Sequence, residues 1–410
     1  MRPILIAAAA GIALAAAPAP ADALEVGATL SQQGDSAYGC VICHSDKRRS
    51  FSVGVHSERG IKCHDCHGGD PTAYEIAPAH RGRFVGTPTK LETVELCSEC
   101  HADPNQMRQF GLAADQLAEF RTSRHGQLLL RQGDDNAPTC TDCHNAHLIL
   151  PPEDARSEVH PTNIPATCGA CHEDEQLMAR YDIPTDQYEK YREGAHGVGV
   201  FEKHNFAAPT CIGCHGSHAA LPPAVGQIAD VCGHCHRTLE RALLEGPHGA
   251  PALDGSIPGC LGCHSNHGTA RTPPEEIAAL CAECHDAGSR AGLMGVEIQE
   301  QVLRAAEELH ISAEAIEELV EMGHEADDDR FRYQAALTDY QQIALVQHSL
   351  DMEQLEELGL RVRSNTGIIR STAEHLAEER WEHKLLLIPI WFLALSAVAL
   401  AWFKLRELGS

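Results

Sequence analysis

The chain has 410 residues and a formal net charge of −26, with 26 histidines and 18 cysteines. Because phosphate binding needs a basic face, this acidic balance excludes a nucleic-acid-binding protein. A neutral or basic protein partner is easier to bring close to such a surface.

The first residues are typical of a secretory signal. Arg2 precedes an apolar run from Ile4 to Ala17, and Ala21-Asp22-Ala23 fits an A-x-A cleavage site. The run is short and rich in alanine, which disfavours a first membrane helix. We therefore expect residues 1–23 to be a signal peptide and the mature chain to start near Leu24, outside the cytoplasm.

Between residues 40 and 285 the pattern C-x-x-C-H occurs nine times and uses all 18 cysteines. Zinc sites pair two C-x-x-C units, and a disulfide framework needs no histidine after each pair, so both explain the pattern poorly. The pattern is the attachment site of a c-type haem, in which two thioethers hold the porphyrin and the histidine ligates iron. We predict nine covalently attached haem c groups, and export agrees with them. The sites are Cys40, Cys43 and His44; Cys63, Cys66 and His67; Cys97, Cys100 and His101; Cys140, Cys143 and His144; Cys168, Cys171 and His172; Cys211, Cys214 and His215; Cys232, Cys235 and His236; Cys260, Cys263 and His264; and Cys281, Cys284 and His285.

Histidines outside these motifs follow a repeat. In three copies a His-Gly pair precedes C-x-x-C-H-x-x-H, and a second C-x-x-C-H follows; a looser copy comes before them. Only an iron explains why two spare histidines recur with each pair of motifs, so we predict them as distal axial ligands. The last histidine of C-H-x-x-H is expected to ligate a neighbouring haem, because it lies too close to its own proximal histidine. The predicted ligands are His56, His80, His125, His147, His196, His218, His248 and His267.

Nine six-coordinate irons need one further ligand. We choose His160, which lies eight residues before Cys168, with His204 as the alternative. His64 and His234 lie inside motifs, where the thioether loop points them away from their own iron, and we interpret both as incidental.

The region from Cys40 to His285 resembles the doubled-C-x-x-C-H multihaem cytochromes c of bacterial respiratory chains. The three C-H-x-x-H motifs and the upstream His-Gly pairs carry the resemblance. It implies periplasmic electron transfer along closely packed, mostly bis-histidine haems. The haem at Cys40 and the looser first copy depart from the family pattern.

The short intervals between the motifs predict a mainly α fold with much irregular structure, in which short helices and turns wrap around stacked haems. After His285 the chain lacks cysteine, and apolar residues recur at alternating steps of three and four. This spacing predicts two or three long helices packed as a hairpin or small bundle, with Gly323 ending one helix and Asp327–Asp329 capping the next. The predicted seams are Val302, Ala306, Leu309, Ala313, Ile316 and Val320, and then Leu355, Leu358, Val362, Asn365, Ile369, Thr372 and Leu376.

Five histidines lie in this helical region, and we interpret them as solvated, although one could reach a haem as an axial ligand. They are His310, His324, His348, His375 and His383.

The stretch from Leu385 to Phe403 is 19 residues without a charge, which is long enough to span a bilayer. Trp391 and Trp402 suit the interfaces, and the basic residues that follow suit the cytoplasmic side. The predicted domains are a nine-haem domain at 24–287, a helical domain at 288–384, a transmembrane helix at 385–403 and a cytoplasmic tail at 404–410.

Two functions fit this organisation. In the first, the chain is anchored on the periplasmic side of the bacterial cytoplasmic membrane and relays electrons between a membrane quinol-oxidising partner and periplasmic or outer acceptors. In the second, it is a multihaem oxidoreductase that converts a small nitrogen or sulfur compound at one open haem iron. Because the spare histidines suffice for all nine irons, we prefer the first and assign no catalytic residue. Copies of the chain could also associate through the helical domain.

Overall fold

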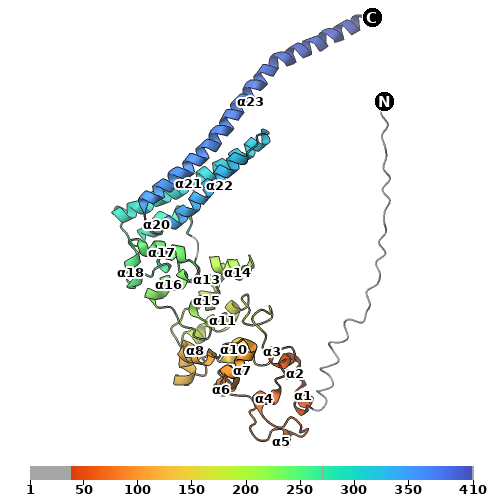
Figure 1. The fold of residues 1–410 in the computed structure, drawn as a ribbon, viewed down its shortest axis with the longest axis vertical. Coiled ribbons are helices and arrows are strands. Elements are labelled where there is room, and N and C mark those ends of the chain that lie inside the picture. Colours follow the sequence, from red (N-terminus) through yellow and green to blue (C-terminus); the bar gives the residue numbers. More distant parts are fainter. Residues whose placement is uncertain (1–37, 270–271, 409–410) are drawn as a thin grey trace. The chain divides into compact units, whose positions relative to one another are not determined.

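The structure, a computed structural model, describes residues 38–269 and 272–408 (Figure 1). The predicted signal peptide lies outside the described residues. The described chain is mainly helical with much irregular structure, and its only β pairing is an isolated bridge between Gly68 and Phe84. The predicted fold class is therefore confirmed. The chain divides into two compact units, the first ending at Asn163 and the second beginning at Ile164.

The first unit consists of short helices joined by turns. Its longest helix, α6 (Lys90–His101), begins with a capping box, in which the Thr89 side chain accepts from the Glu92 amide and the Glu92 carboxylate accepts from the Thr89 amide. The same helix ends with a C-x-x-C-H motif. The other elements are α1 (Gly39–Cys43), α2 (Ser45–Phe51), α3 (Val55–Glu58), α4 (Cys63–His67), α5 (Ile76–Ala79), α7 (Pro104–Met107), η3 (Arg108–Phe110), α8 (Gln116–Thr122), α9 (Arg124–Gly126), η4 (Gln127–Arg131) and α10 (Cys140–His144).

The second unit starts with a similar series of short helices and continues into three long ones. The short elements are α11 (Ile164–His172), α12 (Glu175–Met178), α13 (Gln187–Glu193), α14 (Ala195–Phe201), α15 (Cys211–His215), η5 (Val225–Gln227), α16 (Ile228–Gly233), α17 (Arg237–Glu245), α18 (Gly249–Leu253), α19 (Leu261–His264), η6 (Pro274–Glu276) and α20 (Ile277–Ala282). The long helices are α21 (Arg290–Glu321), α22 (Asp327–Val346) and α23 (Met352–Leu408), which pack side by side as a three-helix bundle (Figure 1). Gly323, with φ +83°, follows the end of α21, as predicted. The N-cap of α22 is Ala326, which makes no side-chain cap hydrogen bond, and Asp327 is already the first helical residue, so the prediction of an aspartate cap is wrong.

The buried face of α21 agrees with the predicted seam at Val302 and Leu309 and lies one residue earlier at the other predicted positions. Ala305, Ser312 and Leu319 are buried, whereas Val320, a predicted seam residue, is 46% exposed. Each of these buried residues is followed by another small or apolar one, so hydrophobicity alone could not choose between the two registers. The packing of α21 against both α22 and α23 determines which register is buried.

On α23 the seam is largely as predicted, since Leu355, Leu358, Val362 and Ile369 are buried. Thr366 is buried where Asn365 was expected, and Ala373 where Thr372 was expected. The Thr366 hydroxyl lies 3.0 Å from the Val362 carbonyl oxygen and 3.1 Å from Glu308 Oε2, so the buried hydroxyl is satisfied.

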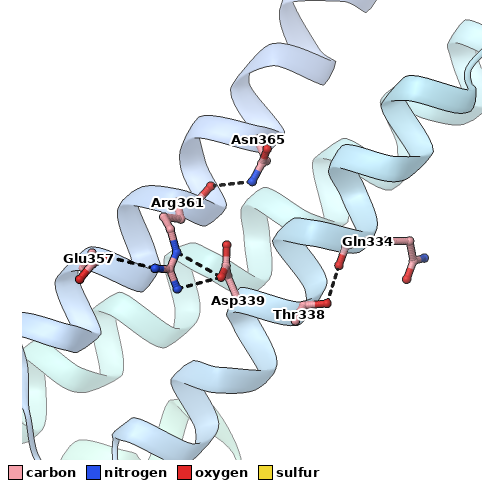
Figure 2. A network of polar contacts seen from close by, with 6 residues as sticks. All are labelled: Gln334, Thr338, Asp339, Glu357, Arg361 and Asn365. Atoms are coloured by element: carbon pink, nitrogen blue, oxygen red, sulfur yellow. Dashed lines mark hydrogen bonds and ion pairs between the residues drawn. The ribbon is translucent and has the colours of Figure 1, made fainter.

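Figure 2 shows the polar contact that joins α22 to α23. Arg361 donates from Nε and Nη2 to Asp339 Oδ1 at 3.2 and 3.0 Å, and from Nη1 to Glu357 Oε1 at 3.0 Å. The Asp339 side chain is only 14% exposed, so the contact favours one register between the two helices.

Beyond the bundle, α23 continues alone (Figure 1). It contains the predicted 385–403 segment without interruption, with Pro389 inside the helix. This part of α23 is long and apolar enough to cross a membrane, and none of it is buried within the chain.

Candidate haem-binding sites

Seven of the C-x-x-C-H motifs form about one turn of helix, whereas those at Cys232 and Cys281 begin in the last residues of α16 and α20 and continue as turns. In α4, α10 and α15 the motif is the whole helix, and in α6 and α11 it is the last turn. Residues three and four apart share one helix face, so the two cysteines and the histidine of a motif present their side chains on the same side. All 18 cysteines have free thiols, as covalent attachment of a porphyrin requires.

The residue after the first motif of each repeat has a positive φ. The values are +68° at Gly68, +65° at Asn145, +79° at Gly216 and +58° at Ser265. This conformation costs energy for any residue except glycine. At Asn145 the side-chain oxygen offsets this cost, because it accepts hydrogen bonds from the backbone amides of Ala146 at 2.8 Å and His147 at 3.2 Å. This turn lies between the motif and the next spare histidine. The spacing of the motifs did not predict it.

The glycine of each His-Gly pair allows two helices to approach closely. A Cβ at Gly126, Gly197 or Gly249 would lie 1.8, 2.1 or 2.2 Å from a backbone carbonyl oxygen at the end of the preceding helix. No L side chain fits there, which explains why glycine recurs after the histidine.

At least seven proximal histidines face a second imidazole ring. A histidine nitrogen binds a transition metal at about 2 Å, so two imidazoles on opposite sides of one iron have ring centroids about 6 Å apart. The observed centroid separations are 6.4 Å for His44–His80, 6.1 Å for His67–His147, 6.1 Å for His101–His56, 6.0 Å for His215–His267, 6.2 Å for His236–His196, 6.1 Å for His264–His348 and 6.1 Å for His285–His248.

These pairs follow a rule within the repeat. The histidine of a His-Gly pair faces the second motif of its own repeat, as His196 faces His236. The last histidine of C-H-x-x-H faces the first motif of another repeat, as His267 faces His215. That arrangement is the geometry expected for a histidine that serves a neighbouring haem.

His348 differs from expectation, whereas His160 stays a prediction. The ring of His348, which sequence analysis interpreted as solvated, lies against His264 at an interplanar angle of 21°. His160 is 8% exposed, and its Nδ1 lies 2.7 Å from the Thr162 hydroxyl. His125 and His218 remain predicted ligands, and His144 and His172 are the two other proximal histidines.

The facing histidines are held in the neutral form that binds metal. Burial lowers the pKa of His56, His147, His196, His248, His267 and His348, and the facing histidine lowers it further. A neutral imidazole keeps the lone pair that a metal needs, so the apoprotein disfavours protonation where an iron would compete with a proton.

Backbone carbonyls fix the tautomer of several rings. The Nδ1 atoms of His67, His215 and His348 lie 2.9, 3.2 and 2.9 Å from the carbonyl oxygens of Val85, Leu221 and Ala344. A carbonyl oxygen can only accept, so each Nδ1 carries the hydrogen and Nε2 presents its lone pair.

Cysteines of consecutive motifs are neighbours. The thiol of Cys97 lies beside that of Cys140, that of Cys211 beside Cys168, and that of Cys232 beside Cys260, close enough to shift the thiol pKa. Electrostatic interactions likewise connect Cys66 to Cys100, Cys214 to Cys235, and Cys263 to Cys281. Within each unit the attachment points therefore follow one another in chain order.

The donor set fits haem better than a bare metal ion. In the described residues no group of three or more His, Cys, Asp or Glu side chains is arranged to hold a metal, whereas structural zinc needs four protein ligands. Both clusters of buried apolar side chains in the described chain belong to the bundle. The motif region thus lacks a comparable apolar core, and an apolar porphyrin between two imidazoles would supply one.

A family model described as the doubled CXXCH motif matches residues 250–290. The match supports a multihaem c-type cytochrome. It covers the last pair of motifs, with covalently bound haem c as the cofactor that such motifs indicate. Neither a curated protein nor a solved structure gives a match to the chain.

Proposed function

We propose that the chain is a nine-haem c-type cytochrome, anchored on the periplasmic side of the bacterial cytoplasmic membrane, that relays electrons between a membrane quinol-oxidising partner and periplasmic or outer acceptors. The observation that carries the proposal is the facing of two imidazoles at seven motifs, with centroids 6.0 to 6.4 Å apart. Two imidazoles on one iron leave no position for a substrate, which favours electron transfer over substrate conversion.

When bound, haem c supplies an iron that accepts and donates one electron. The chain contributes the order of the sites. Cysteines of consecutive motifs contact each other, as Cys97 contacts Cys140 and Cys232 contacts Cys260. Within each unit, such contacts support a row of sites that follows the sequence rather than a cluster around one catalytic centre.

The part of α23 that lies in the bundle separates the proposed anchor from the start of that helix. The axis of α23 rises about 50 Å between Met352 and Leu385, at 1.5 Å per residue. All nine motifs precede this helix, and a lone helix forms no quinone pocket. We therefore propose that a separate membrane partner oxidises quinol. A redox group of that partner then passes the electrons to the motifs, which lie away from the anchor segment in the sequence.

Intact mass spectrometry of the mature chain tests the haem count. The proposal predicts a mass equal to the chain from about Leu24 plus nine haems. A mass with fewer haem additions would contradict the proposal, because at least one C-x-x-C-H motif would then carry no haem.

A ligand titration separates the relay from the alternative oxidoreductase. Nitrite, hydroxylamine and sulfite are added in turn to the oxidised and the reduced protein, and the visible spectrum is recorded. The relay predicts no spectral change and no turnover with an artificial electron donor. A saturable shift of one haem would instead support the enzyme.

A further inference from the structure

The pairing rule of the repeat assigns no C-H-x-x-H histidine to one motif, the first motif of the last repeat. The first motif of a repeat faces the C-H-x-x-H histidine of a later repeat, as His67 faces His147 and His215 faces His267. His264 belongs to the first motif of the last repeat, so no later C-H-x-x-H exists to serve it. Its distal ligand must come from elsewhere in the chain.

The start of α21 marks where the repeat ends. Ser289-Arg290-Ala291-Gly292 matches Ser123-Arg124-His125-Gly126, except that alanine replaces histidine. The serine Oγ accepts the glycine amide in both, at 3.1 and 2.9 Å, and a Cβ at Gly292 would lie 2.4 Å from the Asp286 carbonyl oxygen. The serine–glycine hydrogen bond and the close contact of the glycine are therefore retained at the start of α21, but the histidine is replaced by Ala291. This is expected where no further motif follows.

We infer that His348, in the turn between α22 and α23, is the distal axial ligand of the haem attached at Cys260 and Cys263, and thus the ninth ligand. The inference rests on the proposed nine-haem function. The His348 and His264 rings lie 6.1 Å apart at 21°, within the range of the other pairs. Its Nδ1 donates to the Ala344 carbonyl at 2.9 Å, so Nε2 is left with a lone pair for iron.

Close packing holds the turn that carries His348 against the motif region. A Cβ at Gly246 would lie 2.7 Å from the Ser349 carbonyl oxygen, and α17 packs on α22. The Arg361–Asp339 contact favours one register between α22 and α23, the two helices that flank the turn. These contacts position the ring before any metal binds, which is the preorganisation that a ligand site requires.

The other bundle histidines lack this geometry. His324 Nε2 lies 3.1 Å from Asp329 Oδ2, and His310 and His375 lie near glutamates one helical turn away at 3.6 and 3.7 Å. The rings of His310 and His375 therefore interact with exposed glutamates and that of His324 with the buried Asp329, whereas His348 faces a proximal histidine. Coordination by His348 would tie the helical domain to the haem domain through an iron.

The test replaces His348 with alanine in the full-length holoprotein. Intact mass first confirms nine haems, which separates a failure of the proposed function from a failure of this inference. Low-temperature EPR of the oxidised protein is then expected to show one haem changed from low-spin to high-spin, and added imidazole to restore it to low-spin. His324→Ala is the matched bundle control and is expected to leave all haems low-spin.

Two further variants keep the inference falsifiable if His348→Ala is poorly loaded. His348→Met is expected to keep the haem low-spin and raise its reduction potential, since methionine ligation raises that potential. His160→Ala tests the rival ninth ligand and is expected to leave the spin states unchanged. A high-spin haem in His160→Ala, with His348→Ala and His348→Met both like the wild type, would overturn the inference.

Discussion

The ring of His147 stacks on that of His67, with centroids 6.1 Å apart and planes at 17°, although His144 is only three residues away in the sequence. This repeat therefore supplies a histidine to a motif that another repeat carries, as the last repeat does when His267 faces His215. Because such histidines contribute both to packing and to the proposed coordination, replacing one is expected to disturb a haem site far away in the sequence.

Replacing His267 with alanine is expected to convert one low-spin haem to high-spin, namely the haem attached at Cys211 and Cys214. The reason is that His267 faces His215 at 6.0 Å. Optical and EPR spectra of the oxidised variant measure the change.

Removal of single attachment sites identifies the haem that is affected. With Cys211 and Cys214 both replaced by alanine, His267→Ala should add no high-spin signal. With Cys260 and Cys263 replaced instead, it should still add one. The reverse pattern would show that His267 serves its own motif, against the interlocked arrangement.

Gly197→Ala is expected to displace His196, because the new Cβ would lie 2.1 Å from the Tyr191 carbonyl oxygen. The expected result is a high-spin haem or loss of haem at the Cys232 motif, measured by EPR and intact mass. Gly367→Ala is the control, since a Cβ there meets nothing within 4 Å, and it should stabilise α23 by about 0.5–1 kcal/mol. Equal effects of both substitutions would contradict the steric account.

The shifted seam positions of α21 predict a difference between two adjacent residues. Leu319→Ala should destabilise the bundle by about 2–5 kcal/mol, because the Leu319 side chain is fully buried. Val320→Ala should change stability by about 0.5 kcal/mol or less, since Val320 is 46% exposed. Hydrogen exchange of α21 peptides in the two variant holoproteins measures both changes. A larger effect of Val320→Ala would support the seam predicted from the sequence instead.

Truncation after Lys384 is expected to release a soluble protein with its haem spectrum and haem count intact. The buried clusters of the bundle end at Ala373, so the cut leaves the bundle core complete. Membrane fractionation of cells that express the full and the truncated chain measures the effect. A truncated chain that still sediments with membranes would place the anchor elsewhere.

The sequence predicted the elements that repeat or that obey a strong periodicity. The cysteine motifs, the long helices and the apolar segment of α23 follow from spacing alone, because each needs only local residues to be recognised. The pairing of His196 with His236, by contrast, depends on how far the chain turns between them, which no local pattern encodes.

His348 shows why part of the site escaped prediction. It lies outside the repeat, in a turn of the helical domain, and its sequence neighbours Gln347 and Ser349 give no ligand signal. Only the packing of α17 on α22 brings it to His264. The one available signal was arithmetical: no C-H-x-x-H motif follows the last repeat, so the offset between repeats assigns no such histidine to His264.

The central claim is that every iron has two protein ligands, and low-temperature EPR of the oxidised full-length protein tests it most directly. The account predicts low-spin ferric signals only. A high-spin signal amounting to one haem per native chain would contradict it, because that iron would have an open position at which a small substrate could bind and react.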